Sequence, residues 1–160
     1  MLYMNKKMKK KLNRIRMGDR IEYLNNIKIR PPEFVELSGC ILLKDEHRTL
    51  KEDEVESTLL NNYKGDRTWL ESSFNEFLAY NYVRIDEMKP IEQLSSAIEI
   101  VDLLAINLSK VFPKYKFHIV VIYDNHYCNL RFYRVREGER PWIDIKSIEN
   151  SSDAIAIRAI

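Results

Sequence analysis

The sequence has little glycine, proline or cysteine: 160 residues contain four, five and two of them. So little glycine and proline excludes long flexible linkers, and a hydrophobic content of 45% excludes a disordered chain. Two cysteines are too few for the disulfide framework of a small secreted domain. We therefore expect Cys40 and Cys128 to be free thiols in the cytoplasm, although one bridge between them stays open.

Long apolar runs are also lacking. No segment approaches the ~20 apolar residues that cross a bilayer, and no apolar stretch of a signal peptide follows the basic N-terminus. The four glycines stand alone, so no phosphate-binding loop is present. The three histidines, His47, His118 and His126, lack the spacing of zinc ligands. The sequence therefore predicts no metal and no cofactor.

Residues for nucleophilic catalysis are equally scarce. Cys128 with His126 or His118 is the one plausible thiol–imidazole pairing, but Cys128 lies in a strand expected to face the core. A buried cysteine usually behaves as a small apolar side chain. We therefore expect a protein that is not an enzyme, and keep a small enzyme using Cys128 as an alternative.

The net charge of +2 is unevenly distributed. Removing the basic residues of segment 1–16 leaves 19 basic against 24 acidic side chains, a net charge of −5 for the rest of the chain. We expect residues 1–16 to be a basic, frayed extension ahead of a single domain over residues 17–160. As an alternative, the extension binds nucleic acid or an anionic membrane through seven side chains: Lys6, Lys7, Lys9, Lys10, Lys11, Arg14 and Arg16.

Helical periodicity is clearest over residues 90–112, where apolar residues recur every three or four positions between Pro90 and Pro113. This helix should lie across a sheet. Shorter helices are expected near 50–63, capped by Thr49 and ended by Gly65, and near 142–149, and residues 71–78 are also compatible with a helix.

Strand patterns fill much of the remaining chain. Residues 20–29 and 34–44, the latter with Gly39 as a bulge, should pair around Pro31 and Pro32. Further strands are expected over residues 80–86, 117–123, 127–136 and 154–160, with 117–123 in the sheet interior. The predicted fold class is α+β: an antiparallel or mixed sheet with the long helix packed on one face.

The C-terminal half carries a resemblance. Segments 117–121 (FHIVV) and 130–133 (LRFY), the turn 136–139 (REGE), Trp142 and the final strand are similar to small uncharacterised bacterial proteins. Segment 81–86 (NYVRID) resembles a strand of the same group, with Tyr82 and Arg84 in place of histidines. Such proteins are often suggested to be immunity proteins, which bind and neutralise secreted toxins without catalysis. The resemblance implies a protein partner of that kind.

The acidic segment 45–56 is the strongest candidate for a partner surface, since carboxylates can imitate phosphates and speed encounter with a basic site. Tryptophan, tyrosine and arginine side chains are typical anchors of such interfaces. The predicted partner-binding residues are Asp45, Glu46, Glu52, Asp53, Glu56, Trp69, Arg131 and Tyr133.

Overall fold

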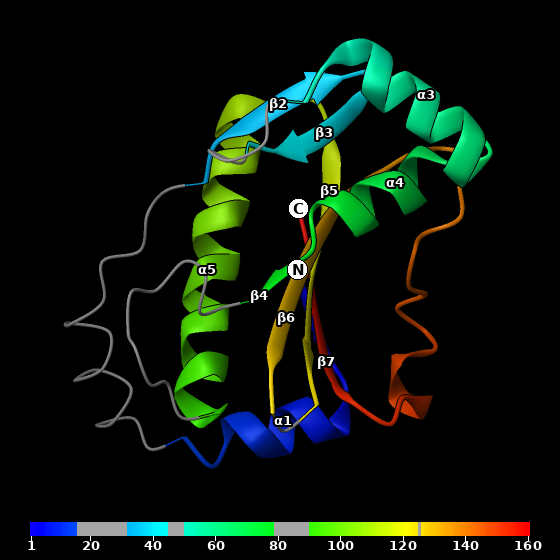
Figure 1. Ribbon diagram of the computed structural model, residues 1–160. Coiled ribbons are helices and arrows are strands. Elements are labelled where there is room, and N and C mark those ends of the chain that lie inside the picture. Colours follow the sequence, from blue (N-terminus) through cyan, green and yellow to red (C-terminus); the bar gives the residue numbers. More distant parts are fainter. Residues whose placement is uncertain (16–31, 45–49, 79–89, 125) are drawn as a thin grey trace.

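The computed structural model describes residues 1–15, 32–44, 50–78, 90–124 and 126–160 (Figure 1). Its main sheet is five-stranded and antiparallel, with strand order β1-β7-β5-β6-β4, and a separate hairpin is formed by β2 and β3. The predicted α+β class is confirmed. The strands are β1 (Leu2–Met4), β2 (Phe34–Leu37), β3 (Cys40–Leu43), β4 (Phe77–Leu78), β5 (Lys116–Tyr123), β6 (Cys128–Val135) and β7 (Ala154–Ala159), and the helices are α1 (Lys6–Leu12), α3 (Glu52–Tyr63), α4 (Arg67–Phe74) and α5 (Pro90–Val111).

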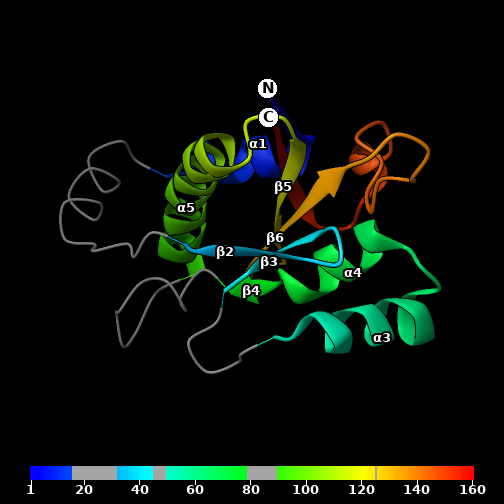
Figure 2. The ribbon, with the colours of Figure 1, turned by 90° about the horizontal axis from the view of Figure 1, so that it is seen from above.

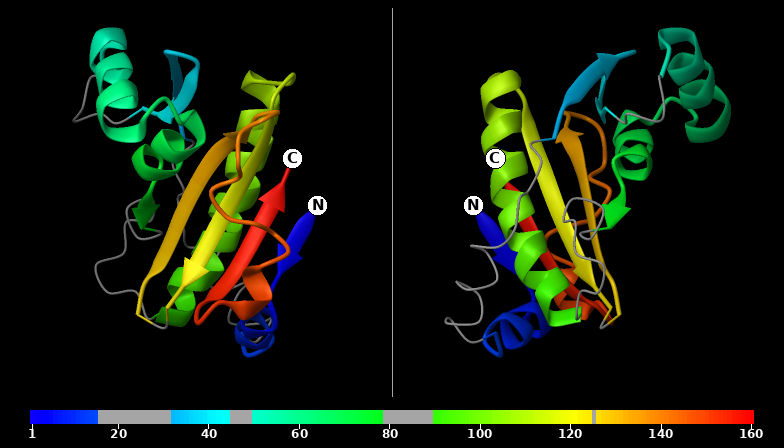
Figure 3. Two further views of the ribbon diagram at one scale, coloured as in Figure 1. Left: turned by 90° about the vertical axis from the view of Figure 1, so that its right-hand side faces the viewer. Right: turned by 60° about the vertical axis from the view of Figure 1, so that its left-hand side comes forward.

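Helix α5 runs along one face of the main sheet (Figure 3), as its wide apolar stripe predicts. Alternate residues of β5 and β6 point toward it and form the largest core cluster, including Phe117, Ile119, Leu130 and Phe132. Strand β5 lies between β7 and β6, so its predicted interior position is confirmed. Among the described residues, no helix has the length and apolar character needed to cross a membrane.

The opposite face of the sheet is covered by the segment that links β6 to β7 (Figure 3). The predicted helix near 142–149 is replaced there by turns and by the 3₁₀ turn Ile148–Asn150. The cause is local: the backbone N–H and the hydroxyl of Ser147 both donate to the Asp144 carbonyl, an i to i+3 pattern. Ile148 and Trp142 still pack on the sheet.

The N-terminal segment is part of the fold over its first twelve residues, which corrects the expected frayed extension. Strand β1 pairs with β7, placing Met4 opposite Ala156. The Asn5 side chain donates to the carbonyls of Ile148 and Asp153 and accepts from the N–H groups of Met8 and Ile155. Met8 is fully buried in the main core. Packing of Met4, Met8 and Leu12 against the main core, at a spacing that the run of lysines obscures, fixes this segment.

Segment 34–44 is a hairpin and not one bulged strand. Ser38 and Gly39 have φ angles of +51° and +73°, so both central turn positions are left-handed, as in a two-residue type I′ hairpin. Helices α3 and α4 lie on the side of this hairpin away from α5 (Figure 2). The predicted strands over 20–29 and 80–86, and Thr49, lie outside the described residues.

The other helices agree with the sequence in outline. Helix α3 begins two residues later than predicted, after Lys51, and Gly65 (φ +82°) follows its left-handed C-cap Lys64. The segment 71–78 is helical only as far as Phe74, because α4 starts earlier, behind the cap Asp66, and β4 begins at Phe77.

Replacing Asn5 with alanine should lower the free energy of unfolding by about 2–3 kcal/mol, because buried backbone groups would lose their partners. Urea unfolding measures the change. The control is Asn13→Ala at the exposed end of α1, expected to cost less than about 1 kcal/mol. A loss for Asn5→Ala no larger than that of the control would contradict the role given to the Asn5 side chain.

Candidate functional site

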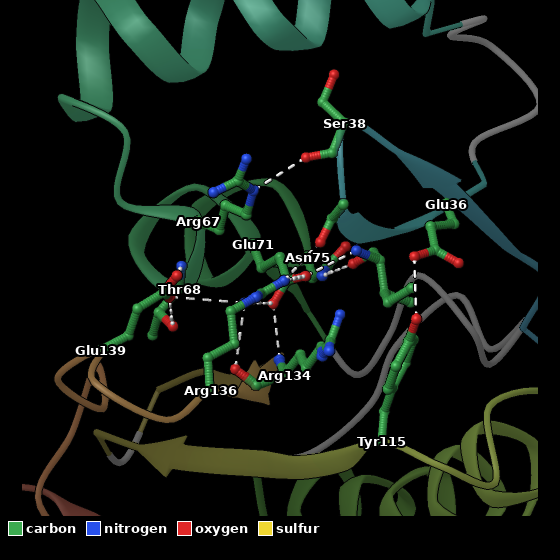
Figure 4. A network of polar contacts seen from close by, with 12 residues as sticks. Glu36, Ser38, Arg67, Thr68, Glu71, Asn75, Tyr115, Arg134, Arg136 and Glu139 are labelled. Carbon is green, nitrogen blue, oxygen red and sulfur yellow. Dashed lines mark hydrogen bonds and ion pairs between the residues drawn. The ribbon is translucent and has the colours of Figure 1, made fainter.

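A buried carboxylate on α4 joins three parts of the fold (Figure 4). Glu71 is fully buried, and each of its oxygens accepts two hydrogen bonds. Oε1 accepts from the Ile41 N–H at 2.7 Å and from Arg136 Nη2 at 2.6 Å. Oε2 accepts from the Arg134 N–H at 2.7 Å and from Arg136 Nη1 at 3.0 Å. One side chain thus connects β3, α4 and β6.

Asn75, one turn further along the chain, makes a parallel connection. Its Oδ1 accepts from the Leu43 N–H at 2.7 Å, and its Nδ2 donates to the carbonyls of Ile41 at 2.8 Å and Phe132 at 3.2 Å. Strand β4 pairs with β6 only at Asn129 and Leu130, so the rest of this β6 edge needs other partners. Glu71 and Asn75 provide them, and the hairpin is thereby attached to the sheet.

The charge of Glu71 is balanced inside the protein. Burial raises the pKa of its carboxyl above the ordinary value, while the Arg136 guanidinium and the two backbone N–H groups act in the opposite direction. Arg136 also donates to the Gly39 carbonyl at 2.8 Å. With four donors in place, the Glu71 carboxylate is fully occupied, so its role is structural and not that of a general base.

The acidic residues predicted to bind a partner are split by the structure. Glu52, Asp53 and Glu56 are exposed on α3, whereas Asp45 and Glu46 lie outside the described residues. Glu52 also accepts from the backbone N–H and the hydroxyl of Ser38, so it supports the hairpin turn as well.

Trp69 lies beside this helix and is 52% exposed, as a surface anchor should be. Its ring meets the Tyr63 ring edge to face, with centroids 5.6 Å apart. Sequence reasoning missed Leu60, which is 62% exposed and lies one turn after Glu56 and one turn before Tyr63. Its exposure has no sequence signal, because an apolar residue in an amphipathic helix is expected to face the core.

The other two predicted anchors lie elsewhere. Arg131 forms an ion pair with Glu76 at 2.6 Å, and its guanidinium lies 4.5 Å from the Trp142 ring centroid. Tyr133 is fully buried, with its hydroxyl 3.0 Å from His118 Nδ1, and burial raises its pKa to about 12. Tyr133 is therefore a core residue, which corrects its assignment as a surface anchor.

Four of the seven basic residues of the N-terminal segment border an open hollow of about 310 Å³, which we call the basic hollow. Arg16 lies outside the described residues, and Lys6 and Lys9 are exposed but do not line the hollow. The described residues that line it are Lys7, Lys10, Lys11, Arg14, Tyr123, Ser152 and Ala154.

The two cysteines are free thiols, as predicted, and both are buried. Cys128 packs under α5, whereas His118 points to the opposite face of the sheet and His126 is exposed. Burial raises the pKa of the Cys40 thiol to about 12 and that of Cys128 further still. Within the described part of the chain, no three His, Cys, Asp or Glu side chains gather in a way that could hold a metal ion.

Comparison with known proteins gives one match. The model of the uncharacterized protein PM0498 family matches residues 3–160. No curated protein and no solved structure matches the chain. The matched range includes α1, the hairpin and the main sheet except for Leu2, the first residue of β1.

Replacing Arg136 with alanine should cost about 3–5 kcal/mol of unfolding free energy at pH 7, because it leaves the Glu71 charge buried without its partner. The pKa of Glu71 would rise further above its ordinary value of 4.5, so the variant is most stable below that pH and loses stability as the pH rises. The loss should thus be smaller at pH 4 than at pH 7 in urea unfolding.

The matched control is Lys44→Ala, which breaks the exposed Lys44–Glu33 pair (3.0 Å) and should cost less than about 1 kcal/mol. A loss of stability for Arg136→Ala as small as that of the control, or one independent of pH, would contradict the role of Arg136 in stabilising the buried Glu71 carboxylate.

Neither cysteine should react with iodoacetamide at neutral pH in the folded protein, because both thiols are buried and protonated. Both should react once urea unfolds the chain, as followed by intact mass. Rapid labelling of Cys128 in the folded state would revive the small-enzyme alternative.

Proposed function

Because this chain belongs to the uncharacterized protein PM0498 family, whose description carries no activity, we propose a function from its surface: it is a non-enzymatic module that binds a basic protein. The observation that carries the proposal is an exposed Trp69 that contacts Tyr63 of an acidic helix, with the exposed Leu60 on the same helix. We call this surface the acidic–aromatic face and define it by Glu52, Asp53, Glu56, Leu60, Tyr63 and Trp69.

The anchor is held in place before binding. The backbone N–H of Trp69 donates to the Asp66 carboxylate at 2.8 Å, so Asp66 caps α4. The Trp69 ring lies against the Tyr63 ring. A large aromatic side chain that is already ordered loses little conformational entropy when a partner covers it. Such residues supply much of the binding energy in protein interfaces.

The carboxylates determine which sign of charge the partner should carry. Glu52, Glu56 and Leu60 follow one another at i, i+4 spacing, so the acids and the apolar side chain form one row on α3. Exposed charges of one sign speed association with an oppositely charged partner more than they add to affinity. A basic protein that buries Leu60 and Trp69 would satisfy both parts of the face.

The resemblance of the C-terminal half to toxin-associated immunity proteins suggests the form of this activity. In that form, the partner is a toxin whose basic active site is covered by the acidic–aromatic face. The Arg131 and Trp142 stack belongs to the far side of the sheet and takes no part in this proposal.

The test is affinity purification of the tagged full chain from its native cells, followed by mass spectrometry and binding kinetics with the partner recovered. Glu56→Lys should slow association about tenfold at low salt and flatten its salt dependence. Trp69→Ala should speed dissociation, with a loss of about 2 kcal/mol in binding free energy.

The controls are two substitutions on the outer surface of α5. Asp102→Lys makes the same change of charge at another exposed helical position, and Ile106→Ala removes an apolar side chain that is 65% exposed. Both should leave binding unchanged. A partner held equally well by all four variants would remove the acidic–aromatic face from consideration.

A further inference from the structure

We propose that the basic hollow binds a small ligand that carries clustered phosphate groups. The hollow lies at the end of the molecule formed by α1, where the N-terminal end of α5 also lies (Figure 1). This site shares no residue with the acidic–aromatic face, so either proposal can fail without the other.

The first observation is an arrangement of like charges that lowers stability. Lys7 and Lys11 are four residues apart in α1, and Arg14 lies in the turn that follows it, with its backbone N–H donating to the Lys11 carbonyl. Like charges at this spacing repel one another. The buried Met8 fixes the rotation of the helix, so the backbone positions from which these cations reach the hollow are set. A bound anion would remove this repulsion.

The second observation is that part of the rim is already positioned. Lys7 Nζ donates to the carbonyls of Ser151 at 3.1 Å and Ser152 at 2.8 Å, and Lys11 Nζ lies 5.6 Å from the Tyr123 ring centroid. None of the described lining residues is acidic. The nearby Asp124 carboxylate accepts from the His126 and Tyr127 N–H groups of its own turn.

The dimensions and chemistry favour a compact ligand over a polymer or a bilayer. A volume of about 310 Å³ is at the small end of ligand sites. Tyr123 is only 5% exposed, so it offers no face on which a base could stack. Met8 and Leu12 pack against the core, which leaves α1 without an apolar face for a membrane. Four cations around a small hollow match several phosphates on one small molecule.

The experiment is calorimetric titration of the full chain with inorganic triphosphate at low ionic strength. Saturable binding at one site is expected, and Lys10→Ala/Arg14→Ala should weaken it at least about tenfold. The charge-matched control, Lys110→Ala/Lys114→Ala at the far end of α5, should bind like the unmodified protein. Circular dichroism checks the fold, and Lys10→Gln replaces the double variant if that variant unfolds.

A second titration uses single-stranded DNA of about 12 nucleotides, a length that covers an ordinary strand-binding site. Displacement of the DNA by triphosphate supports the compact site. The proposal is overturned if triphosphate binding does not saturate, or if the control pair of substitutions weakens that binding equally. It is also overturned if DNA binds through Lys10 and Arg14 and triphosphate does not displace the DNA.

Discussion

The attachment of the hairpin depends on buried polar contacts of α4 and its C-cap Asn75, above all on the buried ion pair of Glu71 with Arg136. The hairpin packs Ile41, Phe34 and Leu43 into the main core, but α4 adds no residue to it, so apolar packing does not by itself join all three parts. The carboxylate instead satisfies N–H groups of both β3 and β6, and Arg136 reaches the hairpin turn at Gly39. Removing either partner would leave buried polar groups without bonds, which costs more than the pair contributes.

This attachment also positions the surface we assign to partner binding. Helix α4 and its C-cap direct Glu71 and Asn75 toward the interior and Trp69 toward the surface. The buried network that holds α4 therefore also fixes the position of Trp69. Helix α3 is linked to the hairpin turn through Glu52 and Ser38. The acidic–aromatic face is therefore a consequence of how the hairpin is held.

Sequence patterns predicted the parts of the fold that depend on periodic burial. The long helix, the interior strand β5 and the alternation of β6 follow directly from their apolar spacing. The same patterns failed where a few polar contacts decide the structure. The Asn5 side chain holds a lysine-rich segment in the sheet, and Ser38 with Gly39 turns one apparent strand into two.

The candidate sites show the same limit. Glu56 and Trp69 could be proposed from the sequence because charge and aromatic type are visible there, whereas the exposure of Leu60 and the burial of Tyr133 depend on which way each element faces. Glu71 was missed because a buried glutamate looks like any surface glutamate until its donors, from segments 30 and 65 residues away, are known.

The distribution of charge gives the two surfaces a common physical basis. Helix α1 and helix α3 lie at opposite ends of the molecule (Figure 1), and one carries only basic and the other only acidic charged side chains. A basic protein is therefore attracted to the α3 end and repelled from the α1 end, which orients it before contact. A polyphosphate bound in the basic hollow would reduce the repulsion at α1 and weaken that orientation without touching the acidic–aromatic face. If both proposals hold, the two sites are coupled only through the electrostatic field, and salt should suppress that coupling before it suppresses either binding event.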